Sequence, residues 1–176
     1  MFLRARAKRS LLKILVFVLL TSTGFYTAFR VGDTSVSAEG TVTNLTTGTA
    51  ASGLSWYAIT SSSDGTKLAA AETGSGDIWT SADSGSTWTN QTTGTGASGH
   101  VWYSIAGSLD GTKLAALEPS GDIWTSTDSG ETWTNQTIGT GATSQYWQSV
   151  ASSADGTKLV AVTAFGDGST GDIWTS

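Results

Sequence analysis

The chain has 176 residues, no cysteine, and 14 acidic against 9 basic side chains, which gives a net charge of −5. Without cysteine there is no disulfide framework, so packing and hydrogen bonds must hold any folded part together. Six of the nine basic residues precede position 39, which leaves three lysines and a net charge of −10 on residues 39–176. Because such a surface repels phosphate groups, we exclude nucleic acid and anionic lipid as partners of this part.

The first 38 residues differ from the rest of the chain. Five basic side chains precede an unbroken apolar run at 14–20, and Val36-Ser37-Ala38 offers the small residues of a cleavage site. We interpret residues 1–38 as a secretory signal peptide and expect an exported protein, either secreted, periplasmic or on the cell surface. The alternative is an uncleaved N-terminal anchor, for which the apolar stretch is short. In that case this segment is the only part that contacts a membrane.

Residues 39–176 repeat with a period of about 45 residues. Asp-Gly-Thr-Lys-Leu occurs at 64–68, 110–114 and 155–159, and Gly-Asp-Ile-Trp-Thr-Ser occurs at 76–81, 121–126 and 171–176. A fixed period of this length is typical of chains built from copies of one supersecondary unit. No helical periodicity follows residue 40.

Each copy predicts four short strands, which in the first copy span 56–60, 67–71, 77–81 and 87–92. An Asp-Gly turn joins the first two strands, and the Gly- and Thr-rich stretch at 93–99 crosses to the next copy. Repeats of this kind predict an all-β fold made of antiparallel four-stranded β-propeller blades. The blades span about 56–92, 101–137 and 147–176, and residues 41–46 match the fourth strand of another blade.

The pattern Ser-x-Asp-x-Gly-x-Thr-Trp lies between the third and fourth strands at 81–88 and 126–133, and a further copy begins at Thr175. Across residues 41–176 the chain resembles the Asp-box, or bacterial neuraminidase repeat, family of sialidase-like β-propellers. That family includes sialidases, xyloglucan-cleaving glycosidases, sortilin-type receptors and photosystem II assembly factors. The resemblance implies that the box has a structural role: its Asp accepts hydrogen bonds from backbone N–H groups of the turn, and its Trp packs inward. The box residues are Ser81, Asp83, Gly85, Thr87, Trp88, Ser126, Asp128, Gly130, Thr132 and Trp133.

About three blades are fewer than the roughly four to eight of a closed propeller. Two arrangements are open. In the first, the chain is the N-terminal part of a longer propeller, and residues 41–46 complete its last blade. In the second, the chain assembles with copies of itself into a ring. A stop in mid-motif at Thr175-Ser176 favours the first arrangement.

The residues argue against catalysis. The resemblance implies an arginine cluster in sialidases, but residues 39–176 contain no arginine. Xyloglucan-cleaving relatives use two carboxylates across a cleft, and acidic residues alone can perform that chemistry. The aspartates here, however, recur at turn positions. We therefore assign no catalytic residue, no metal and no cofactor.

Propellers usually bind ligands on the face formed by the interblade loops and the turns between second and third strands. There, His100 is the only histidine, and Glu72 and Glu118 share one repeat position. Aromatic side chains at this face can stack on sugar rings, whereas the alternative is that the tryptophans only pack the blades. The candidate ligand-binding residues are Trp56, Tyr57, Glu72, His100, Trp102, Tyr103, Glu118, Tyr146, Trp147, Phe165 and Asp167.

The sequence therefore predicts an exported, non-catalytic binding or scaffolding module that recognises a glycan or a protein surface. One alternative is the N-terminal part of a propeller glycoside hydrolase. Another is a photosystem-type assembly factor, which should carry a basic patch that this acidic chain lacks.

Overall fold

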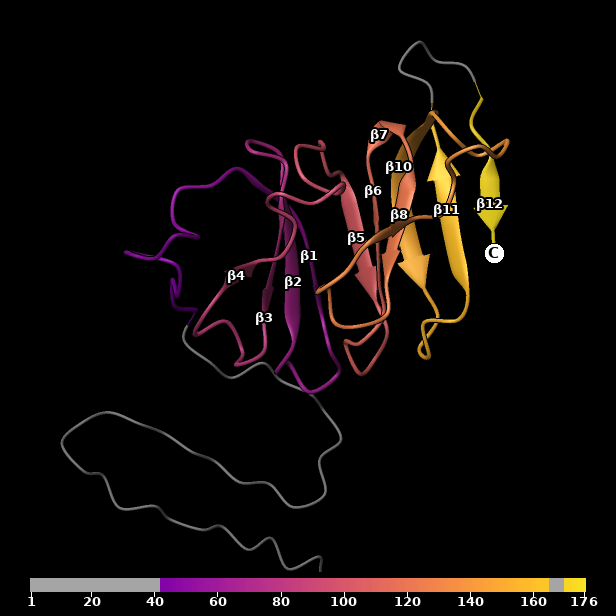
Figure 1. Cartoon of the computed structure of the whole chain (residues 1–176). Helices are drawn as coiled ribbons and strands as arrows, with labels where there is room; N and C mark the ends of the chain where they lie inside the picture. Colours follow the sequence, from indigo (N-terminus) through magenta and orange to yellow (C-terminus); the bar gives the residue numbers. More distant parts are fainter. Residues whose placement is uncertain (1–41, 165–169) are drawn as a thin grey trace, which may run out of the picture. The chain divides into compact units, whose positions relative to one another are not determined.

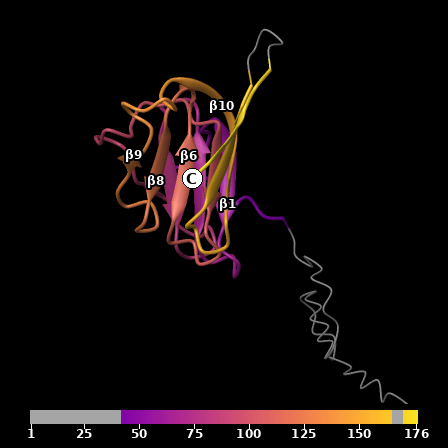
Figure 2. The same ribbon diagram turned by 90° about the vertical axis from the view of Figure 1, so that its right-hand side faces the viewer.

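The computed structural model describes residues 42–164 and 170–176, and these residues form three four-stranded antiparallel sheets. The sheets lie face to face in chain order (Figure 1), and Figure 2 views the same row from the third sheet. The predicted all-β fold of four-stranded propeller blades is confirmed. Within the described ranges, no helix is long and apolar enough to cross a membrane.

The first blade has the strand order β1-β2-β3-β4. Its strands are β1 (Trp56–Ser61), β2 (Leu68–Glu72), β3 (Ile78–Ser81) and β4 (Thr89–Asn90). The alanines of β2 are almost completely buried. Their small side chains let neighbouring sheets approach both faces of this strand, as a middle strand in a stack requires.

The second and third blades repeat this arrangement with one addition. The second contains β5 (Ser104–Gly107), β6 (Leu114–Leu117), β8 (Ile123–Ser126) and β9 (Thr134–Asn135). The third contains β10 (Gln145–Ser152), β11 (Leu159–Thr163) and β12 (Ile173–Thr175). The turn between β6 and β8 forms an extra strand, β7 (Pro119–Gly121), which pairs with β10 of the third blade. Proline is tolerated there because β7 is an edge strand.

Residues 42–46 carry no strand, contrary to the prediction of a fourth strand at 41–46. A strand needs a partner for its ladder hydrogen bonds, and no strand in the described part of the chain lies beside this segment. Instead, the Asn44 side chain accepts hydrogen bonds from the backbone N–H groups of Thr46 and Thr47. Residue 41 lies outside the described residues.

Two hydrophobic clusters join the blades, and both use the same repeat positions. In the first cluster, Ile78 of the first blade packs with Trp102 and Ile105 of the second. In the second, Leu117 and Ile123 of the second blade pack with Trp147 and Val150 of the third. Each interface therefore joins one blade's second and third strands to the first and second strands of the next blade.

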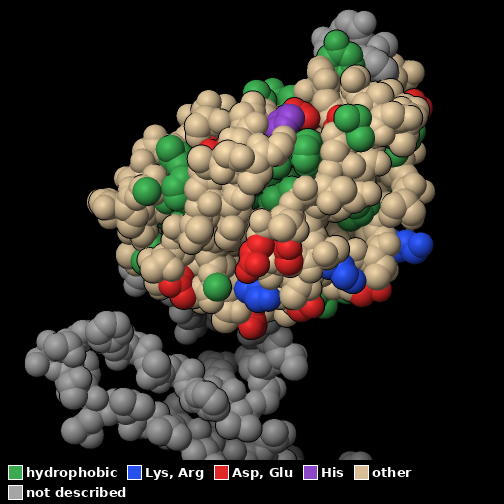
Figure 3. Space-filling view, viewed as in Figure 1, with side chains coloured by type: hydrophobic (Ala, Val, Ile, Leu, Met, Phe, Trp, Pro, Cys, Tyr) green, Lys and Arg blue, Asp and Glu red, His purple; other side chains and the backbone are tan. Residues whose placement is uncertain are grey.

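The up-and-down strands place the connections at two ends of the stack. We call one the box end, which contains the Asp-Gly hairpins and the two boxes at 81–88 and 126–133. The other is the loop end, which contains the interblade loops and the turns between the second and third strands. Figure 3 shows lysines and many acidic side chains at the box end and the single histidine at the loop end.

Candidate binding site at the loop end

In each of the two boxes, the aspartate accepts hydrogen bonds from residues of its own turn. One oxygen of Asp83 accepts hydrogen bonds from the Ser81 hydroxyl and the Thr87 N–H, both at 2.8 Å, and the other accepts from the Thr87 hydroxyl at 2.7 Å. Asp128 makes the same three bonds in the second blade. The threonine donors, with the serine, hold the pKa of both carboxyls below its ordinary value. Both carboxylates are therefore committed to their own turns.

The Asp-Gly hairpins use their aspartates in the same way. Asp64 accepts hydrogen bonds from the Ser62 hydroxyl at 2.6 Å and the Thr66 N–H at 3.0 Å, which lower its pKa to about 2. Asp110 and Asp155 repeat this arrangement, and their pKa values are also lowered to about 2. These carboxylates are therefore committed to holding turns.

An aspartate that we did not select from the sequence anchors each of the loops at 93–99 and 138–144, and the first of the two, Asp77, is buried. One Asp77 oxygen accepts from the hydroxyls of Thr92 and Ser98, both at 2.9 Å, and the other from the Asn90 amide and the Thr93 hydroxyl, both at 2.8 Å. Burial opposes ionisation of Asp77, but these donors outweigh it and lower the pKa. The recurrence of Gly-Asp-Ile-Trp together with Asn-Gln-Thr could have revealed this network.

Asp122 is the matching anchor in the second blade. It accepts hydrogen bonds from the side chains of Asn135, Thr137 and Thr143 at 2.7–2.8 Å. Here too burial opposes ionisation, and the donors lower the pKa.

Glu72 is not available to a ligand, so its selection as a binding residue is wrong. The residue is completely buried. Its carboxylate accepts hydrogen bonds from the Gly74 N–H at 2.6 Å and the Ser75 N–H at 2.9 Å, and from the Ser75 hydroxyl. Glu72 therefore closes its own turn between β2 and β3.

Glu118 occupies the same repeat position but meets a different partner. Its turn to Asp122 is one residue shorter than the turn from Glu72 to Asp77. The Glu118 carboxylate points instead to His100, whose Nδ1 lies 2.7 Å from Oε2. The side chain of His100 is 27% exposed and that of Glu118 is 16% exposed, so a ligand can reach the pair.

The His100 ring is held on both sides. Its Nε2 lies 3.0 Å from the carbonyl oxygen of Gly96, and Nδ1 faces the Glu118 carboxylate. Both partners are hydrogen-bond acceptors, so together they fix the orientation of the ring. The ring also contacts Trp102 and Trp124, with centroids 5.3 and 5.2 Å apart.

The tryptophans near the start of each repeat, Trp56, Trp102 and Trp147, pack within or between the blades. Trp102 and Trp147 are completely buried, so neither can contact a ligand, and their selection as binding residues is wrong. Trp56 is partly buried and packs against Trp79 and Trp88 of its own blade. The candidates Phe165 and Asp167 lie outside the described residues.

Three tyrosines remain accessible near the start of the first strands. The rings of Tyr57 and Tyr103 stack with centroids 4.8 Å apart, and Tyr57 is 58% exposed. Tyr146 is 48% exposed and pairs through its backbone with Pro119, the neighbour of Glu118. The backbone N–H of Tyr103 donates to Leu117 on the other side of Glu118. The backbones of Tyr103 and Tyr146 thus pair with the two chain neighbours of Glu118.

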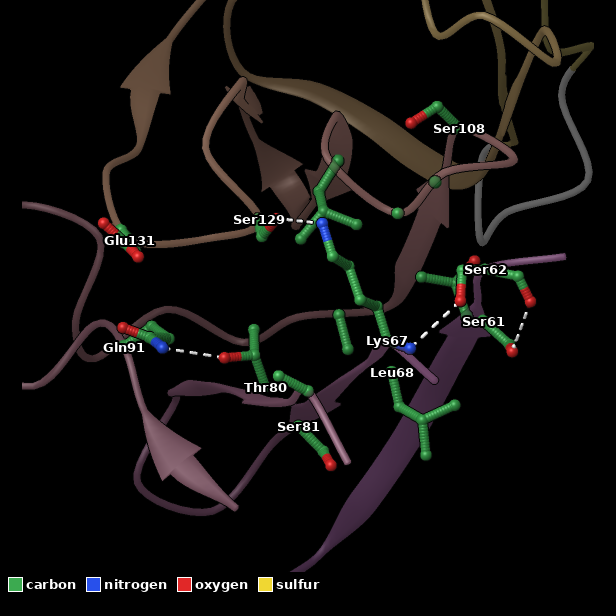
Figure 4. Close-up of a pocket in the computed structure, with 16 residues that line it drawn as sticks. Ser61, Ser62, Lys67, Leu68, Thr80, Ser81, Gln91, Ser108, Ser129 and Glu131 are labelled. Carbon is green, nitrogen blue, oxygen red and sulfur yellow. Dashed lines mark hydrogen bonds between the residues drawn. The ribbon is translucent and has the colours of Figure 1, made fainter. Parts of the chain in front are cut away.

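A cavity of about 310 Å³ lies between the first two blades at the box end. Figure 4 shows Lys67 reaching across it to the Ser129 hydroxyl at 3.1 Å, and the Gln91 amide donating to Thr80 at 2.7 Å. The same repeat positions around Lys158 form a second hollow on the third blade. The cavity therefore follows from repeated packing. Among the described residues, no three metal-ligating side chains group together.

No family model and no curated protein matches the chain, whereas solved structures do. One is YCF48 bound to D1 peptide, with a TM-score of 0.54, 14% identity, and coverage of 70% of this chain and 38% of that one. Another is an ancestral GH74 enzyme, with a TM-score of 0.53, 16% identity, and coverage of 70% of this chain and 19% of that one. A third comes from a nidogen/laminin complex, with a TM-score of 0.52, 12% identity, and coverage of 69% of this chain and 43% of that one.

At these identities the likeness shows the propeller fold alone. This chain spans less than half the length of each of the three.

Proposed function

We propose that this chain is a non-catalytic β-propeller module that binds a peptide or protein surface through its loop end. The observation that carries the proposal is that the exposed Tyr57 and Tyr146 and the half-buried Tyr103 lie at the same end of the stack as the accessible His100–Glu118 pair. This pair breaks the repeat, so it is not needed to build a blade. Tyrosine is enriched at protein interfaces because its ring offers apolar area and its hydroxyl offers a hydrogen bond.

The state of the other carboxylates argues against hydrolysis by this part of the propeller. General acid catalysis requires a carboxyl that keeps its proton near the working pH. Asp64, Asp77 and Asp83 have lowered pKa values and bind donors of their own turns, as do their counterparts in the second blade. These groups are poor proton donors and are held away from a substrate.

A peptide fits the loop end better than a sugar ring does. Tyr57 and Tyr103 stack on one another, so one face of each ring is already occupied. Their remaining edges and hydroxyls suit the mixed contacts of a peptide. Two of the similar structures are named for complexes with a peptide or a protein. The basic and then apolar sequence of the N-terminal segment supports a location of the proposed module outside the cytoplasm.

The test is selection from a phage-displayed random peptide library against the full chain, with a glycan array run in parallel. We expect enriched peptides whose dissociation constants rise at least about tenfold in Tyr57→Ala, the loss of one good contact. Leu109→Ala is the matched control, because Leu109 is 57% exposed but lies in a box-end hairpin. Binding of glycans alone, or equal loss in the Leu109 variant, would contradict the proposal.

A further inference from the structure

The contact between His100 and Glu118 ties two segments of the loop end together. His100 directly follows the interblade loop at 93–99, and Glu118 begins the turn that contains β7. Oε2 of Glu118 lies 2.7 Å from the ring, and Oε1 accepts a hydrogen bond from the backbone N–H of Asp122 at 3.4 Å. The carboxylate therefore links the ring to the far end of the turn.

The third blade shows what the repeat requires of the other side of the ring. Gln145 stands at the position of His100, at an offset of 45 residues, and its side-chain N–H donates to the carbonyl oxygen of Gly141 at 3.2 Å. Nε2 of His100 lies 3.0 Å from the carbonyl oxygen of Gly96, which is the same position of its loop. Because a carbonyl oxygen only accepts, this contact needs a hydrogen on Nε2.

The carboxylate makes the same demand on the other ring nitrogen. Nδ1 of His100 lies 2.7 Å from Oε2 of Glu118, and an ionised carboxylate accepts hydrogen bonds but donates none. A neutral imidazole has a single N–H and can satisfy only one of the two acceptors. Both contacts together therefore require a second proton on the ring, which histidine gains or loses within roughly pH 5 to 8.

Of the charged groups in the described residues, Glu118 is the one that contacts the ring. The other charged groups in the elements around the ring are Glu72, Asp77 and Asp122, and each accepts hydrogen bonds from its own turn or loop. The lysines of residues 39–176 lie in the box-end hairpins. A response of this contact to pH therefore comes from His100 and Glu118 themselves.

The second copy alone combines a base with an acid at these two positions. The first copy has Leu54 and Glu72 there, and the third has Gln145 and Thr163. Both of those blades form the same four-stranded order without the pair. Building a blade therefore does not require it.

We propose that His100 is a proton-dependent link that regulates binding at the loop end, an inference that rests on the proposed function. At lower pH the doubly protonated ring donates to both Gly96 and Glu118, and it fixes the turn that contains β7. At higher pH the ring keeps one N–H, one of the two contacts is lost, and the turn is released. Because β7 pairs with Tyr146, the fixed turn orders the binding site in advance, and a peptide binds more tightly.

The first test follows the free, isotope-labelled chain by NMR between about pH 5 and pH 8. His100 is the only histidine, so its ring signals are unambiguous. We expect the amide signals of Gly96, Ser120 and Gly121 to shift over the same pH interval as the ring. In His100→Gln they should stay in place. This variant should fold, because the third copy has glutamine at the same position, and circular dichroism checks it. Amides that do not follow the ring, or that still shift in the variant, would overturn the proposal.

The second test measures the dissociation constant of a library-selected peptide that contains no histidine, at about pH 5.5 and about pH 8. We expect binding to be about fivefold tighter at the lower pH, the ratio that a partly exposed ion pair can supply. His100→Gln should remove this difference, and the box-end variant Leu109→Ala should keep it. Equal binding by the unaltered chain at both pH values, or an unchanged difference in His100→Gln, would contradict the link. If no peptide is selected, the proposed function fails, whereas the free-chain titration still decides this inference.

Discussion

The box end and the loop end come from the same repeat, yet only one of them is uniform. At the box end, Asp83 and Asp128 make the same bonds to the same positions of their turns. At the loop end, Glu72 is buried in its own turn, whereas Glu118 reaches His100. The turn is one residue shorter in the second blade, and His100 stands where the first copy has Leu54. Uniform positions therefore build the blades, and positions that diverge are free to bind a partner.

The largest expected loss in the free energy of unfolding comes from a substitution at the loop end, where the first two blades join. Gly76 has a φ of +77°, and a Cβ there would lie 2.4 Å from the His100 carbonyl oxygen. Gly76→Ala should lower the free energy of unfolding by about 3 kcal/mol, because backbone strain and a clash add together. Urea denaturation measures this loss.

Gly94→Ala is the matched control. Gly94 has a φ of +78°, but nothing lies within 4 Å of an added Cβ. Backbone strain alone should cost about 1 kcal/mol in the free energy of unfolding. Equal losses in the two variants would show that the contact with His100 has no energetic weight.

The next effect compares the two kinds of aspartate. Asp77→Ala should lower the free energy of unfolding by about 2–3 kcal/mol, because it leaves the buried Thr92 hydroxyl and three further donors in part-buried hydrogen bonds without an acceptor. Asp83→Ala should cost less, since its turn is exposed and water can replace the carboxylate. Denaturant midpoints of both variants measure the difference, and a larger loss for Asp83 would reverse this ranking.

Acid should weaken the box end through its hairpin aspartates. The pKa of Asp64, Asp110 and Asp155 falls from the ordinary 3.8 to about 2 in the folded chain. The unfolded chain then binds more protons, so stability is complete above pH 3.8 and is lost as pH falls toward 2. Thermal unfolding between pH 5 and about pH 2 follows this loss. The variant Asp64→Asn should show a shallower slope; an unchanged slope would contradict this account.

The smallest effect on stability should come from the His100–Glu118 pair. Because both side chains are partly exposed, Glu118→Gln should change the free energy of unfolding by less than about 1 kcal/mol. The same variant should raise the dissociation constant of a selected peptide by about tenfold, since a charge-assisted contact is lost. Calorimetric titration and urea denaturation together separate the two effects. A large loss of stability with unchanged binding would make the pair structural.

The blade fold could be predicted because its signals are local. The Asp-Gly turns, the alternating strands and the recurring Trp positions each specify their element without reference to the rest of the chain. Asp83 and Asp128 accept the hydrogen bonds of their own turns, which are local contacts of the same kind.

The loop end was harder to predict because its features depend on neighbouring blades. β7 forms only because the shortened turn at Pro119–Gly121 meets β10. Trp102 and Trp147 lose their exposure only when the preceding blade covers them. From the sequence, Asp77 looks like another turn residue, because its partners Asn90 and Ser98 are distant along the chain and meet it only in the fold. Only the joint recurrence of Gly-Asp-Ile-Trp and Asn-Gln-Thr points to the Asp77 network, and no local pattern indicates the other contacts.

The most direct test of a loop-end binding site is an NMR titration of the ¹⁵N-labelled chain with a peptide selected from the library. The account predicts that the perturbed amide signals gather around Tyr57, His100, Tyr103, Glu118 and Tyr146. Signals of Asp64, Lys67 and Asp83 at the box end should stay in place. Perturbations that centre on the Lys67 cavity or on the two Asp-boxes would contradict it.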